Sequence, residues 1–176
     1  MFHGQSNYDM MIRKFHGGHI MPKETISFTQ FMEAVEADNK IFIQALHDFL
    51  MEKSCKLTIE EKKSGFMASY KYNKKSIINF LFRKTGMLVR VYGENASKYP
   101  HFLDTLPEEM TQHIKDWGIC KRLVHNTCNS RCAGYEFMLD NAFMQKCKYG
   151  CFDFHVTEGN NPYIQSFIEH EIKERG

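Results

Sequence analysis

Residues 57–92 read LTIEEKKSGFMASYKYNKKSIINFLFRKTGMLVRVY, and this stretch decides the fold class. Apolar and polar side chains alternate along it, which is the pattern of half-buried β-strands. The alternation is interrupted at Ser64-Gly65, at Asn73-Lys74-Lys75 and at Lys84-Thr85-Gly86, and each break has the residue types of a tight turn. The stretch therefore predicts a meander of four consecutive antiparallel strands.

Helical periodicity is found on both sides of this meander. Residues 27–53 carry apolar side chains at three- and four-residue spacing, which predicts two helices, or one broken helix, with an acidic outer face that serves as a scaffold and not as a site. A capping-box pattern at residues 105–108 predicts a helix that begins at Leu106 or Pro107. An Asn-Pro pair at residues 161 and 162 caps a predicted last helix.

A second group of strands is predicted near the C-terminus. Alternating apolar residues predict strands at residues 135–139 and 142–147 around a turn at Asp140-Asn141, and another short strand at residues 152–156. Residues 119–134 have no period of their own and are predicted to be a loop. The expected fold is α+β: N-terminal helices, a four-strand meander and a C-terminal hairpin form an antiparallel sheet with helices packed mainly on one face.

Length and composition favour one domain. The 176 residues are 43% hydrophobic and 14% aromatic, which is enough to build a normal core. Residues 1–24 are polar without a sustained period and are predicted to be a flexible tail, whereas residues 25–176 are predicted to form a single α+β domain. No apolar run approaches the ~20 residues that span a bilayer, and no secretory signal is visible, so we expect a cytoplasmic protein. The net charge of +2 is small for a protein that binds nucleic acid, so we do not expect a nucleic-acid partner, and the sequence indicates no other partner.

The cysteines are unevenly distributed, because five of the six fall within residues 120–151. Zinc accepts four thiolates in a tetrahedron, and two close pairs brought together by a hairpin commonly build such a site. We expect a structural zinc ion to be held by Cys120, Cys128, Cys132 and Cys147. If one of these four is not a ligand, Cys151 is the first candidate to take its place. Two alternatives remain: buried thiols without metal, and a thiol-based redox protein with a reactive Cys128 or Cys132.

Catalytic motifs are not found. The sequence has no phosphate-binding glycine loop, zinc-protease helix or nucleophile elbow, so we predict no catalytic residue and favour a non-enzymatic module. The alternative is a domain that binds a small molecule or nucleic acid on the aromatic, basic face of residues 65–92. That face carries six cations, which also suit the protection of sheet edges: Lys71, Lys74, Lys75, Arg83, Lys84 and Arg90.

Similarity to known proteins lies in residues 64–70, 78–84, 88–92, 120–123, 134–137 and 145–149 and in the pair Cys128 and Cys132. These residues resemble a family of small uncharacterised bacterial proteins with a cysteine-rich C-terminal segment, over about residues 27–175. Residues 102–109 are similar to the helix start of YdhG-like domains, an α+β group without a settled function. The first resemblance implies a shared structural role for the cysteine-rich segment, and neither implies a catalytic residue.

Overall fold

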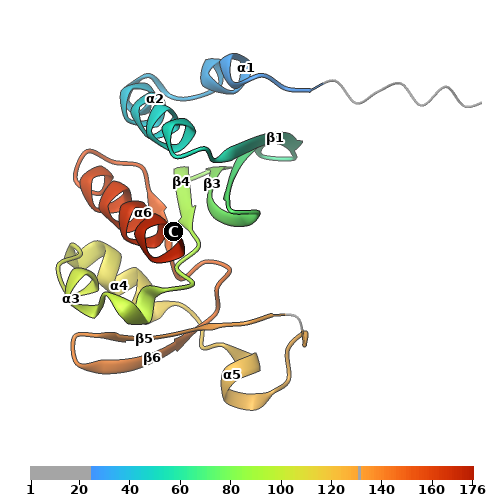
Figure 1. Cartoon of the computed structure of the whole chain (residues 1–176). Helices are drawn as coiled ribbons and strands as arrows, with labels where there is room; N and C mark the ends of the chain where they lie inside the picture. The colour runs from blue at the N-terminus through green and yellow to red at the C-terminus, as the bar shows by residue number, and fades with distance from the viewer. Residues whose placement is uncertain (1–24, 131) are drawn as a thin grey trace, which may run out of the picture.

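The fold combines two antiparallel sheets with six α-helices in a computed structural model that describes residues 25–130 and 132–176 (Figure 1). The predicted tail, residues 1–24, lies outside the described residues. The α+β class predicted from the sequence is confirmed. Within the described part of the chain, no helix has both the length and the apolar character needed to cross a membrane.

The larger sheet is the predicted meander with one strand added. β1 (Lys56–Lys62), β2 (Gly65–Tyr72), β3 (Lys75–Arg83) and β4 (Gly86–Val91) lie side by side in chain order. β7 (Asp153–His155) pairs with β4 at the far edge, and every pair is antiparallel. The prediction of four consecutive strands is confirmed, because the turn residues between them close hairpins in the expected places.

Three helices cover one face of this sheet (Figure 1): α1 (Phe28–Glu33), α2 (Ala37–Glu52) and α6 (Asn161–Arg175). Strand alternation places the fully buried side chains of Tyr70 and Phe80 on that face. Ring contacts continue from the sheet into the helices, since the centroid of Phe80 lies 5.9 Å from that of Phe31 in α1. The predicted packing of helices on one face is thus confirmed. A final row of core residues comes from α6, where Ile164, Phe167, Ile168 and Ile172 are buried.

The N-terminal helical region forms two helices, which is one of the two arrangements predicted; the other was one broken helix. α1 begins after Ser27, whose hydroxyl accepts a hydrogen bond from the Gln30 amide (3.2 Å), while the Gln30 side chain accepts one from the Ser27 amide (2.8 Å). This reciprocal capping satisfies two backbone donors at the helix start. α1 is then held against α2 by the Phe28 ring, which stacks on His47 with centroids 3.6 Å apart.

The segment after the meander is more helical than predicted. It contains a 3₁₀ turn (Ala96–Lys98) and α3 (Pro100–Leu103) before α4 (Glu108–Asp116). The predicted start of α4 at residue 106 or 107 is wrong by one or two residues. Pro107 is the N-cap, and the Thr105 hydroxyl donates to a carbonyl of α3 (2.7 Å) instead of capping α4.

The C-terminal hairpin forms a sheet of its own. β5 (Tyr135–Leu139) and β6 (Ala142–Lys146) pair through the predicted turn at Asp140-Asn141, where both residues have positive φ angles of 50° and 60°. Its buried face packs on the core, with the rings of Phe137 and Phe152 5.2 Å apart. The prediction that residues 119–134 are loop throughout is wrong, because they contain the short helix α5 (Lys121–His125).

Candidate functional site in the cysteine-rich segment

The four predicted zinc ligands lie around one corner of the C-terminal hairpin. Cys120 is buried and is the N-cap residue of α5, and Cys147 is half-buried and follows β6 directly. Cys132 is half-buried and Cys128 is exposed, and both belong to the segment between α5 and β5. The first substitute, Cys151, is in the hydrophobic core with none of its surface exposed.

Backbone pairing brings Cys120 and Cys147 to adjacent chains. The Cys120 amide donates to the Gln145 carbonyl (2.8 Å), and the Cys147 amide donates to the Gly118 carbonyl (3.2 Å). Residues 118–120 therefore lie beside the end of β6, where Ile119 and Lys146 form an isolated antiparallel bridge, although the two segments are far apart in sequence. The hairpin returns the chain in the way that the sequence predicts.

Cys132 approaches the same corner through the start of β5. A Cβ atom at Gly134, two residues later, would lie 2.4 Å from the Cys120 sulfur, so only glycine allows the two chains to pass so closely. A turn closes between Cys128 and Cys132, because the Cys132 amide donates to the Asn129 carbonyl (2.9 Å). Of the two residues that the turn joins, Cys128 is exposed and Cys132 is half-buried.

The thiols act on one another electrostatically. Desolvation raises the pKa of Cys132, and the thiols of Cys128, Cys147 and Cys120 raise the pKa further, while Lys148 lowers it. The other three predicted ligands are therefore within electrostatic range of Cys132. In the described residues, however, no three side chains of His, Cys, Asp or Glu stand close enough together to hold a metal ion.

The thiol pKa values argue against a reactive cysteine. Burial raises the pKa of Cys151 and also that of Cys55, which is buried between α2 and β1. A nucleophilic or redox-active thiol needs the opposite shift, because the thiolate is the reacting species. Each clear shift among the cysteines therefore moves away from the thiol-enzyme alternative.

The six cations of the meander do not gather on one surface. Lys74 and Lys75 are at the β2–β3 turn, whereas Arg83 and Lys84 are at the β3–β4 turn, which is the opposite end of β3. Arg90 is already engaged in a bidentate ion pair with Asp153 on β7, with both N–O distances 2.7 Å. The arrangement gives no support to a continuous stacking surface for nucleic acid.

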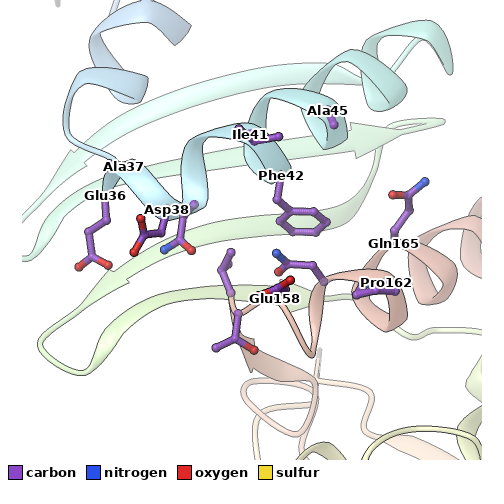
Figure 2. A pocket seen from close by; sticks show the side chains of 13 residues that line it. Glu36, Ala37, Asp38, Ile41, Phe42, Ala45, Glu158, Pro162 and Gln165 are labelled. Carbon is purple, nitrogen blue, oxygen red and sulfur yellow. The ribbon is translucent and has the colours of Figure 1, made fainter.

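The structure reveals a groove between α2 and α6 that sequence reasoning missed (Figure 2). Its volume is about 1160 Å³. The prediction treated the acidic side of α2 as a solvated scaffold. Helical spacing groups Ile41 with the apolar residues of α2, whereas the structure leaves this residue 84% exposed at the groove.

Comparison of the chain with protein-family models, with curated proteins and with solved structures finds no significant match. The two resemblances described from the sequence therefore stay predictions. The class that the fold defines is an α+β domain with a separate hairpin sheet, which is flanked on both sides by segments that carry cysteines.

Proposed function

We propose that the chain is a non-enzymatic α+β module whose C-terminal part is held together by a structural zinc ion bound to Cys120, Cys128, Cys132 and Cys147. The observation that carries the proposal is the approach of three chain segments at one corner: residues 118–120, Gly134 just before β5, and the end of β6. Three of the predicted ligands belong to these segments or lie within two residues of them.

Zinc would supply the stabilisation that this segment lacks. Residues 121–130 and 132–134 include no fully buried side chain, and these residues contain α5. A segment that is exposed on most of its length needs another source of free energy to offset its loss of conformational entropy. A structural zinc site provides such free energy directly, because the metal binds the folded arrangement of thiolates.

Closure of the site requires a local movement of the turn that bears Cys128. The sulfurs must approach a common centre at Zn–S distances of ~2.3 Å. Cys120 and Cys147 are anchored by backbone hydrogen bonds to neighbouring chains, so they form the fixed half of the proposed site. Cys128 and Cys132, on the turn, form the half that closes.

The test is the metal content of the full chain, purified without chelator or acid. We expect elemental mass spectrometry to find one zinc ion per chain, and we expect removal of the zinc with a chelator to lower the melting temperature. Cys128→Ser should lower the zinc content with little other damage, because this side chain is exposed. Cys55→Ser is the matched control, since Cys55 is buried beside the larger sheet and should leave the zinc content unchanged.

Two results would contradict the proposal. One is metal-free protein that does not take up added zinc. The other is a loss of zinc in Cys55→Ser equal to that in Cys128→Ser, because it would report unfolding and not loss of a ligand.

A further inference from the structure

The groove between α2 and α6 is formed by the N-terminal halves of both helices and by the loop that precedes α6 (Figure 2). Phe42 points from α2 into the space between the helices, toward Pro162 at the start of α6. Ala45, Val156 and the exposed Ile41 extend this apolar surface. The groove is at the other end of the molecule from the hairpin and α5 (Figure 1) and shares no residue with the proposed zinc site.

The charge of the groove has one sign. Three carboxylates line it: Glu36, Asp38 and Glu158. Its lining includes no Lys, Arg or His, and among the described residues these carboxylates form no ion pair. A concave surface with carboxylates and low-dielectric walls concentrates a negative potential, which attracts cations.

Two amide side chains in the walls lack hydrogen-bond partners. Asn39 on α2 is only 9% exposed, and within the described residues its side chain makes no hydrogen bond. Asn161 on α6 has a buried side-chain oxygen, Oδ1, for which the described part of the chain supplies no partner. Buried polar atoms are nearly always paired in folded proteins, and leaving one unpaired costs free energy. The Asn39 amide can therefore meet a polar group that enters the groove, whereas Asn161 Oδ1 is covered and can accept a hydrogen bond from such a group only if its side chain turns toward the groove.

The preference of helix starts for acidic residues explains only part of this arrangement. Glu36 is the N-cap residue of α2 and Asp38 lies in its first turn, where carboxylates offset the helix dipole. Dipole compensation does not account for the unpartnered amides, nor for an Ile41 side chain that is 84% exposed on the same surface. These features indicate a ligand that brings both hydrogen-bond donors and apolar groups.

We propose that this groove binds a cationic, amphipathic peptide segment of a partner protein. An arginine side chain carries five N–H donors, which suit carboxylates and amide oxygens together. Apolar residues of the same segment would lie on Phe42, Ile41 and Pro162. The groove, with a volume of about 1160 Å³, has room for several side chains of such a segment.

The experiment measures binding of a short fluorescein-labelled peptide of alternating Arg and Leu to the full chain by fluorescence anisotropy at low salt. We expect saturable binding, and none for the peptide in which Glu replaces Arg. Asp38→Asn combined with Glu158→Gln should weaken binding about tenfold. Ile41→Ser should also weaken it, and this exposed position should leave folding intact, as circular dichroism would verify.

The matched control is Glu61→Gln combined with Glu108→Gln, which removes the same charge from exposed positions on β1 and α4. It should bind like the unchanged protein. Equal weakening by this control, equal binding of the Glu-Leu peptide, or no binding of the Arg-Leu peptide would overturn the proposal. Arg13→Glu combined with Lys14→Glu tests whether the chain's own basic N-terminal residues compete with the peptide. If this variant binds the peptide tenfold more tightly, those residues occupy the groove and the proposal is wrong.

Discussion

Glu171 and Arg175, one turn apart near the end of α6, form an ion pair inside the protein. Arg175 Nε and Glu171 Oε2 are 3.0 Å apart, and the two side chains are 6% and 0% exposed. Glu171 also accepts hydrogen bonds from the Asn95 amide (2.8 Å) and from the Tyr99 hydroxyl, and Arg175 donates to the Tyr92 carbonyl (2.5 Å). The pair therefore ties the last helix to the chain that leaves β4.

Glu171→Gln should strongly destabilise the protein. The substitution leaves Arg175 as a buried charge without its counter-ion, which typically costs about 3–5 kcal/mol of the free energy of unfolding. Glu174→Gln is the matched control on the same helix, because Glu174 pairs with Lys98 at the surface and should contribute less than about 1 kcal/mol. Urea unfolding followed by circular dichroism compares the two, and similar losses would show that the buried pair has no special weight.

His47 should make stability depend on pH. Partial burial lowers its pKa below the ordinary 6.5, with Asp48 acting weakly in the other direction, and its Nδ1 lies 2.7 Å from the Tyr70 hydroxyl. The unfolded chain then binds a proton more readily than the folded one. The stability contribution is complete above pH 6.5 and is lost as the pH falls below that value.

Melting temperatures measured at pH values above and below 6.5 check the effect of His47. His47→Gln should reduce the dependence on pH, whereas His101→Gln, at an exposed position of α3, should retain it. The assignment to His47 is wrong if both variants keep the dependence of the unchanged protein.

Gly150→Ala should disrupt the turn between the hairpin and β7. Gly150 has a φ of +129°, which L side chains rarely adopt, and an added Cβ would lie 1.9 Å from the Trp117 ring. Backbone strain and the clash together should cost about 2–4 kcal/mol and change the fluorescence of the single tryptophan. Gly159→Ala meets nothing within 4 Å and should be nearly neutral. Equal effects on denaturant unfolding would contradict this account.

Cys151→Ala should separate packing from metal binding. This side chain is fully buried in the core, so its loss should lower the free energy of unfolding by about 1–2 kcal/mol. Zinc content should stay that of the unchanged protein, because Cys151 is not one of the four proposed ligands. A fall in zinc content of the folded variant would make Cys151 a ligand in place of one of the four.

The sequence by itself determined the meander, the helical character of residues 27–53 and the C-terminal hairpin, whereas the division of that helical region into two helices was left open. Their signals are local: strand alternation, helical spacing, and turn residues such as Asp140-Asn141 act within a few positions of the chain. The predicted start of α4 is wrong because the Thr105 hydroxyl donates to the Phe102 carbonyl and does not cap the helix. α5 was missed because it is short and buries no side chain.

Only the tertiary structure decided which distant segments meet. β7 pairs with β4 across more than sixty residues, so that Asp153 faces Arg90. Residues 118–120 join β6, and Gly134 passes against the Cys120 sulfur. The groove likewise exists only because α2 and α6 pack side by side on one sheet face. Such contacts depend on the packing of the whole core, which no periodicity within a single segment encodes.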